Sequence, residues 1–278
     1  MEKFLMSYMP VDASAHGAAL DRILIYTHWL MLFLFLGWGL YFIYVLYRFR
    51  ASRNPKADYQ GTRSHISTYS EVAVAIIEAV LLIGFSIPAW ARWVAPHRKA
   101  LNPLEIRVVS EQFAWNIHYP GPDKRFGRTD VKLVSSSNAL GLDLRDPYAK
   151  DDVVTINQLH LEVNRPVSIQ LSAKDVIHSF GLPVMRVKQD AIPGMVMPVT
   201  FTPVKVNNGA KWEIACAQLC GLGHYRMRGE LNVQSKKDFD LWLAKNAPAP
   251  DTQVPPPAPP PVEAAPAAHG ADPAAHGA

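Results

Sequence analysis

The chain has 278 residues, of which 49% are hydrophobic, and a formal net charge of +4 at pH 7. This length allows more than one domain. The small net charge, and the lack of a Lys/Arg cluster interleaved with aromatic residues, argue against nucleic-acid binding. Two cysteines are too few for a disulfide framework in a chain of this size, so we predict that they are ligands.

The N-terminal part begins with a lead-in of mixed polar and apolar residues, which is followed by an uncharged run. Residues 1–22 lack the charged start, short apolar core and small-residue cleavage site of a secretory signal, so we predict an ordered or amphipathic lead-in. Residues 23–47 carry no charged side chain and are long enough to cross about 30 Å of hydrocarbon as a helix. Aromatic residues near the ends of this run are typical of interfacial anchors. A buried core helix is the alternative, but a soluble domain rarely needs one of this length.

The connector at residues 48–70 is basic, and it orients the predicted spans. Its charged residues are Arg48, Arg50, Arg53, Lys56 and Arg63 against Asp58. Because basic loops stay on the cytoplasmic side, residues 72–91 are predicted to return through the membrane as a second span. We therefore predict a multi-pass membrane protein. Its two-helix hairpin covers residues 23–95, and both termini and the next domain are periplasmic.

Two acidic residues mark the second predicted span. Glu71 lies at its cytoplasmic start and Glu78 lies inside it. An ionisable side chain at membrane depth is costly, so it usually faces protein or water and marks a function. For Glu71 the alternative is a solvated acid favoured by the helix dipole. For Glu78 we expect a protonated carboxyl or one paired at an interface.

The next region, residues 96–246, has short β-rich runs separated by turn residues. Even spacing of short strands is typical of a Greek-key sandwich. Residues 235–245 have the pattern of an amphipathic helix. Residues 247–278 are rich in Pro and Ala and are predicted to be a disordered tail, because they cannot bury enough apolar surface to offset their ordering entropy. The predicted strands are residues 104–110, 113–119, 153–154, 159–163, 167–171, 195–201, 212–215 and 229–233.

The two cysteines belong to a dense group of soft metal ligands. Cys216 and Cys220 are followed by His224 and Met227, and His178 is a second imidazole earlier in the chain. Two thiolates, imidazoles and a thioether form a donor set that selects copper, and a second thiolate allows two sulfurs to bridge a pair of copper ions. A disulfide between the cysteines is one alternative. A zinc site is another, although zinc rarely takes Met.

The spacing Cys-x3-Cys-x3-His-x2-Met, preceded by Asp-Val-x-His-Ser, resembles the binuclear CuA site of subunit II of haem–copper cytochrome c oxidases. The likeness extends over nearly the whole chain up to about residue 246. It implies a protein of a bacterial inner (plasma) membrane in which residues 96–246 form a periplasmic cupredoxin domain. In such a site Cys216 and Cys220 bridge the two copper ions, and His178 and His224 bind one ion each. The resemblance makes Met227 a weak ligand of one ion and the carbonyl of Gln218 a weak ligand of the other.

Three further roles follow from the resemblance. Where relatives have a glutamate that helps to hold magnesium, this chain has Gln218, so we expect that magnesium site to be weakened or absent. Phe113 takes the place of the tryptophan that receives electrons from cytochrome c, with Trp115 two residues on; both are candidates for this step, and barrel core is the alternative. Glu71 aligns with a glutamate at the mouth of a proton channel into the catalytic subunit.

The function implied is electron transfer within a terminal respiratory oxidase. The copper site would accept electrons from cytochrome c and pass them to haem, which is bound only in the catalytic haem–copper subunit I, for proton-translocating reduction of oxygen to water. Other oxidase subunits, membrane lipid and a respiratory supercomplex are further partners. A copper-free quinol oxidase subunit is disfavoured by the ligand set, and nitrous oxide reductase by the hairpin. A membrane-anchored copper carrier or insertion protein is the alternative from another class.

Overall fold

The computed structural model describes residues 2–56, 59–60, 64–91 and 102–248. The predicted disordered tail lies outside this part of the chain from residue 249 onward. Residues 92–101, at the predicted junction between the hairpin and the following domain, lie outside it as well.

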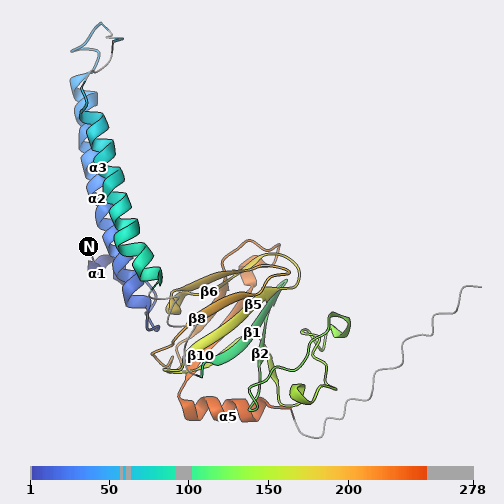
Figure 1. The fold of residues 1–278 in the computed structure, drawn as a ribbon. Coiled ribbons are helices and arrows are strands. Elements are labelled where there is room, and N and C mark those ends of the chain that lie inside the picture. Colours follow the sequence, from blue (N-terminus) through green and yellow to red (C-terminus); the bar gives the residue numbers. More distant parts are fainter. Residues whose placement is uncertain (1, 57–58, 61–63, 92–101, 249–278) are drawn as a thin grey trace, which may run out of the picture. The chain divides into compact units, whose positions relative to one another are not determined.

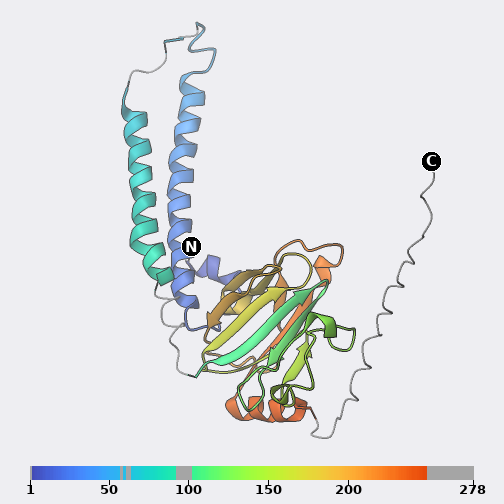
Figure 2. The same cartoon turned by 45° about the vertical axis from the view of Figure 1, so that its right-hand side comes forward.

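Two long apolar helices dominate the N-terminal part. They have 32 and 26 residues, each is long and apolar enough to cross a membrane, and none of the most apolar stretch of either helix is buried. The first begins before the span predicted at residue 23, because the lead-in continues into it. The two helices lie side by side (Figure 2), and the rings of Tyr26 and Phe85 meet edge to face with centroids 6.2 Å apart. The helices are α1 (Glu2–Ser7), α2 (Gly17–Arg48) and α3 (Ile66–Leu81), which continues through the π-helical turn η1 (Leu82–Ser86) and on to Ala91.

The following domain is a β-sandwich of two five-stranded sheets (Figure 1). One sheet has the order β3-β2-β1-β5-β8 and the other β4-β10-β9-β6-β7. Parallel pairs (β1 with β5, β4 with β10) lie within otherwise antiparallel sheets, which confirms the predicted cupredoxin-like Greek-key architecture. The strands are β1 (Leu104–Glu111), β2 (Ala114–Tyr119), β3 (Val153–Ile156), β4 (Gln158–Glu162), β5 (Val167–Ala173), β6 (His178–Leu182), β7 (Val187–Ala191), β8 (Met197–Phe201), β9 (Trp212–Cys216) and β10 (Arg228–Gln234).

Alternating apolar residues build the core between the sheets. Along β1 and β5 every second residue is buried, and the parallel register sets Ile106 opposite Ile169 and Val108 opposite Leu171. Side chains alternate between the two faces of a strand, so these four point to the same side of their sheet. Burying each such side chain contributes roughly 1.5–3 kcal/mol relative to leaving it exposed. The result is a rigid frame for the loops at the strand ends.

β6 and β7 were not among the predicted strands. All five residues of β6 are buried, so it lacks the alternation that reveals a half-exposed strand, and Gly181 lies within it. β7 carries three polar residues between its buried ends. Both strands exist because the sheet pairs them, β6 with β9 on one side and with β7 on the other.

The long segment between β2 and β3 is held to the sandwich by a buried hydrogen bond between a histidine and an aspartate. Two short 3-10 helices, η2 (Val131–Leu133) and η3 (Pro147–Ala149), occur in it. Nε2 of His118 in β2 lies 2.6 Å from Oδ2 of Asp152, and both side chains are almost fully buried. The same carboxylate accepts a hydrogen bond of 2.8 Å from the backbone N–H of Gly127. This pair fastens the segment to the sandwich.

The lead-in before α2 is attached to the sandwich as well. Ala13 is fully buried, and its backbone N–H donates to the Val184 carbonyl at 2.8 Å. Its carbonyl accepts from the backbone N–H of Val204, also at 2.8 Å. Asp21 of α2 forms an ion pair with Arg186, in which both side chains are nearly buried. These contacts explain why the lead-in is ordered.

The helix after the last strand, α5 (Lys236–Asn246), agrees with the amphipathic pattern. The Ser235 hydroxyl accepts from the backbone N–H of Asp238 and so caps its first turn. Trp242 stacks on His160 of β4 with ring centroids 3.9 Å apart. The helix therefore covers one end of the sandwich (Figure 1).

Candidate metal centre

The candidate ligands come together where two neighbouring strands end. β9 ends at Cys216, and the loop from β9 to β10 carries Cys220 and the short helix η5 (His224–Arg226). β6 begins at His178 and pairs with β9 so that Phe180 lies opposite Cys216. This pairing brings an imidazole that lies 38 positions from Cys216 in sequence beside the cysteine loop.

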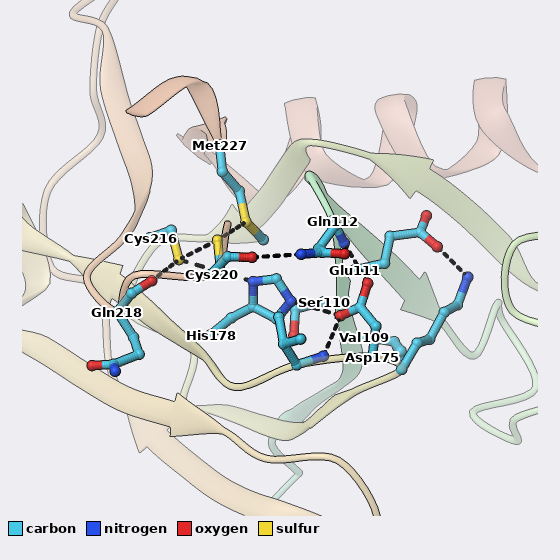
Figure 3. A network of polar contacts seen from close by, with 12 residues as sticks. Val109, Ser110, Glu111, Gln112, Asp175, His178, Cys216, Gln218, Cys220 and Met227 are labelled. Atoms are coloured by element: carbon cyan, nitrogen blue, oxygen red, sulfur yellow. Dashed lines mark hydrogen bonds and ion pairs between the residues drawn. The ribbon is translucent and has the colours of Figure 1, made fainter. Parts of the chain in front are cut away.

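The sulfur atoms lie at the centre of this group (Figure 3). The Sγ atoms of Cys216 and Cys220 are 3.8 Å apart. Cys220 Sγ lies 3.6 Å from His224 Nδ1 and 3.7 Å from Met227 Sδ. Cys216 Sγ lies 4.0 Å from His178 Nδ1. The ligand atoms of His178 and the two cysteines all lie within 4.8 Å of one another.

A backbone oxygen completes the group. The carbonyl of Gln218 lies 3.2 Å from Cys216 Sγ, while the Gln218 side chain is exposed. The six predicted copper ligands are therefore brought together. The Gln218 side chain stands apart from them, so its amide does not compete for the same site.

Cys220 is shielded from solvent, and this affects its thiol. Burial, together with the neighbouring Cys216, raises the pKa of the Cys220 thiol to about 11. A metal that binds here must therefore displace a proton from Cys220. Both cysteines are free, and their separation of 3.8 Å far exceeds a disulfide bond of about 2.05 Å. The structure thus shows two thiols ready to act as ligands.

The orientation of His178 is set by a carboxylate. The ring is fully buried, and its Nε2 lies 2.9 Å from Asp175 Oδ1. With Nε2–H donating to the carboxylate, Nδ1 is left as the free ligand atom facing Cys216. Burial raises the pKa of Asp175, but hydrogen bonds from His178 and from the backbone N–H groups of Gln112 and Val176 outweigh it and lower that pKa overall. The carboxylate therefore stays ionised as an acceptor.

Two glycines let the cysteine loop lie on the turn between β1 and β2. Gly221 has φ +129°, a conformation that side chains disfavour. At Gly223 an added Cβ would lie 2.4 Å from Cδ2 of Phe113. The loop between Cys220 and His224 therefore needs small residues, because it is in close contact with an aromatic ring.

Comparison with known proteins identifies the family. The profile described as "Cytochrome C oxidase subunit II, periplasmic domain" matches residues 104–233. The alternative cytochrome c oxidase subunit 2 of Bradyrhizobium diazoefficiens is 31% identical over 226 residues, which cover 81% of this chain and 79% of that protein. The chain belongs to the cytochrome c oxidase subunit 2 family. It is accordingly a subunit of a haem–copper oxidase, an oxidoreductase complex. With its two apolar helices it is a membrane-anchored subunit.

The chain is also similar to the following proteins. Cytochrome c oxidase subunit 2 of Synechocystis sp. is 27% identical over 262 residues, covering 87% of this chain and 76% of that protein. Among solved structures, the periplasmic domain of subunit II of the cytochrome oxidase of Bradyrhizobium japonicum is 27% identical with a TM-score of 0.37, covering 51% of this chain and 92% of that one.

The donor atoms suit the copper centre that subunit 2 family membership implies. Two thiols and two imidazoles alone would also suit zinc. The buried thioether of Met227, 3.7 Å from Cys220 Sγ, is a soft donor that favours copper instead. The residues present therefore fit copper.

The other predicted residues of this subunit 2 chain take different places. Phe113 precedes β2 and is half-buried beneath the cysteine loop. Trp115 is fully buried, and its ring meets that of His178 edge to face at 6.3 Å. Phe113 thus lies in the turn, not in one strand with Trp115. Glu71 lies in α3 and accepts a hydrogen bond of 3.0 Å from the Ser67 hydroxyl.

Sequence reasoning missed two residues of the site. Asp175 belongs to the motif around His178, and its place three residues before a ligand histidine was an available signal. Gln112 donates from its side chain to the carbonyl of Cys220 at 2.7 Å. Gln112 and Cys220 are 108 positions apart, so no local pattern could have revealed their contact.

Proposed function

We propose that this chain is the electron-transfer subunit of a terminal oxidase and that its sandwich holds a binuclear CuA centre. The ligands are His178, Cys216, Cys220, His224 and Met227 with the carbonyl of Gln218. Bound copper supplies a one-electron relay between cytochrome c and the haem of the catalytic subunit, where oxygen is reduced to water with proton translocation. We propose the division into residues 1–22, 23–95, 96–246 and 247–278 as lead-in, hairpin, copper domain and tail.

One observation supports this proposal above the others, the pair of free cysteine sulfurs 3.8 Å apart with a different imidazole beside each. His178 faces Cys216, and His224 faces Cys220. A single-copper site needs only one cysteine. Two cysteine–histidine pairs would suit a pair of ions.

The surroundings support a relay that changes little in shape. Cys220 is 4% exposed and Met227 is 1% exposed. Asp175 holds the ring of His178, and Trp115 packs against it. Ligands held by rigid strands and buried partners keep their positions when the charge changes. The same burial disfavours a copper carrier, whose ligands must exchange their metal.

Electrons from the donor are proposed to reach the copper centre through the turn between β1 and β2, which carries Phe113. Phe113 is half-buried beneath the cysteine loop, with the guanidinium of Arg226 6.0 Å from its ring. Trp115 is fully buried, so its proposed place is on the inner side, next to His178. Both residues therefore stay candidates for the path from the donor.

The remaining proposals concern the membrane and the partners. Glu71 is proposed as the mouth of a proton channel into the catalytic subunit, supported by its position near the start of α3. The amide of Gln218 is exposed and neutral, which supports a weakened or absent magnesium site. We propose that the copper domain and both termini are periplasmic at a bacterial inner membrane. Cytochrome c, the catalytic haem–copper subunit with the other oxidase subunits, and a respiratory supercomplex are the proposed partners.

The test uses the assembled oxidase and two buried methionines. Met227→Leu removes a thioether beside Cys220, whereas Met185→Leu makes the same change in η4 (Pro183–Met185), where Met185 is fully buried. We expect Met227→Leu to slow reduction of the complex by reduced cytochrome c about tenfold or more, the scale of losing about 1.4 kcal/mol of barrier stabilisation. Met185→Leu should leave the rate unchanged. Equal rates in both variants, or reduction by quinol alone, would argue against the proposal.

A further inference from the structure

Gln112 contacts both loops that carry the candidate ligands. It follows β1 directly, in the turn before β2. Its side-chain Nε2 donates to the carbonyl of Cys220 at 2.7 Å. Its backbone N–H donates to Asp175 Oδ2, also at 2.7 Å. A single residue thus makes one short hydrogen bond to each ligand-bearing loop.

These bonds extend to the ligand His178. Asp175 Oδ1 accepts from His178 Nε2 at 2.9 Å, while the other oxygen of the same carboxylate accepts from Gln112. Figure 3 shows the continuous path from Cys220 through Gln112 and Asp175 to His178. The two ends of this path are ligands proposed to hold the same metal centre.

Other contacts between the two loops lie further back. The backbone N–H of Ala217 donates to the Ser179 carbonyl at 3.0 Å, next to the pairing of Phe180 with Cys216. Cys220 lies beyond the end of β9, where the ladder no longer holds it. Within the described part of the chain, Gln112 makes the hydrogen bond that fixes its carbonyl.

Packing reinforces the hydrogen bond. An added Cβ at Gly221 would lie 2.7 Å from Gln112 Nε2. The loop backbone therefore lies directly on the Gln112 amide, and the absence of a side chain at Gly221 permits the short bond to Cys220. The amide is enclosed by the loop that it holds, even though Gln112 is exposed overall.

We propose that Gln112 is a positioning residue, which ties the Cys220 loop to the His178 loop and so sets the ligand geometry and reduction potential of the centre. This inference rests on the proposed copper function. The side-chain N–H of Gln112 directs its positive end toward the backbone carbonyl of the ligand residue Cys220. Removing this positive end makes the electrostatic potential at the copper centre more negative, which favours the oxidised state of the centre.

The test compares matched glutamine substitutions in the full-length chain. Gln112→Met keeps the side-chain length without the donor, and Gln112→Asn keeps an amide that is one methylene too short to reach. Gln170→Met is the control, because Gln170 of β5 accepts from Arg107 at 3.2 Å, away from the ligands. We expect both Gln112 variants to have a lower midpoint potential, an altered copper hyperfine pattern in the electron-spin spectrum, and copper loss to a chelator about fivefold faster.

A copper-free readout separates this inference from the proposed function. In a Cys216→Ser background without metal, the alkylation rate of the buried Cys220 thiol reports opening of the loop. We expect Gln112→Met to raise that rate about fivefold and Gln170→Met to leave it unchanged. Unchanged alkylation, potential and spectrum in the Gln112 variants, or equal changes in the control, would overturn the positioning role. A parent chain without a two-copper signal, but with faster alkylation in Gln112→Met, would overturn the proposed function alone.

Discussion

Adding one methyl group at Gly223 tests whether the cysteine loop is seated on Phe113. Gly223 has φ −90°, which alanine also adopts, so Gly223→Ala introduces no backbone strain. The new Cβ would lie 2.4, 2.6 and 2.7 Å from three atoms of the Phe113 ring. Real Cβ atoms do not approach so closely, so the ring or the loop must move.

The expected cost follows from overpacking. Inserting a methyl group into a packed site typically costs about 1–3 kcal/mol. With a urea dependence of about 2 kcal/mol per molar, the unfolding midpoint of the metal-free chain in detergent should fall by about 0.5–1.5 M. Near-ultraviolet circular dichroism, which reports aromatic packing, measures that midpoint. His224 follows Gly223 directly, so copper should also leave Gly223→Ala faster than the parent chain.

A double-mutant cycle separates the clash from other effects. In a Phe113→Ala background the ring is gone, and Gly223→Ala should cost at least about 1 kcal/mol less than it does in the parent chain. The reasoning fails if Gly223→Ala leaves the midpoint unchanged in the parent chain. It also fails if the substitution costs the same with and without the Phe113 ring.

Three further substitutions examine other contacts. Asp175→Asn should weaken copper binding about 10–100-fold in chelator competition, because His178 loses the carboxylate that orients its ring. His118→Leu should lower the free energy of unfolding by about 1–3 kcal/mol in urea titrations, because the buried Asp152 carboxyl loses a hydrogen-bond partner. Burial lowers the pKa of His160, and its hydrogen bond to Gln234 opposes this only in part. As the pH falls, His160 is therefore protonated in the unfolded chain before it is protonated in the folded chain. The contribution of His160 to the free energy of unfolding should therefore be fully present above about pH 6.5 and be lost as the pH falls toward the folded pKa. Urea midpoints measured against pH should show a shallower slope in His160→Gln than in the parent chain.

Each of these expectations has a matched check. Asp190→Asn changes an exposed carboxylate of β7 and should leave copper affinity unaltered; a similar loss there would remove the special role of Asp175. Asp152→Asn added to His118→Leu should restore part of the lost stability, and no recovery would contradict the argument that the loss comes from the unpaired Asp152 carboxyl. An unchanged pH slope in His160→Gln would mean that another group causes it.

Local patterns predicted those parts of the molecule that depend on neighbouring residues. The uncharged run at residues 23–47 predicted a helix because hydrocarbon tolerates no free backbone polar groups. The spacing of Cys216, Cys220, His224 and Met227 predicted their grouping because one short loop carries them all. The alternation in β1 and β5 predicted strands because one face of each is buried.

Contacts made across long sequence separations could not be predicted in this way. The ion pair of Asp21 with Arg186 joins residues 165 positions apart and orders the lead-in. β6 was not predicted because both of its faces are buried, so its sequence lacks the alternation of apolar and polar residues. Gln112 reaches Cys220 only because the sandwich brings the β1–β2 turn under the cysteine loop. Such roles depend on tertiary packing, which no local pattern encodes.

The central claim is that two thiols join two copper ions into one electron relay, and metal content with electron-spin resonance on the purified full-length chain tests it most directly. The account predicts about two copper ions per chain and a spectrum in which one unpaired electron is shared equally between both nuclei. One copper ion per chain with a spectrum confined to a single nucleus, or sulfurs of Cys216 and Cys220 that stay joined as a disulfide during copper loading under reducing conditions, would contradict it.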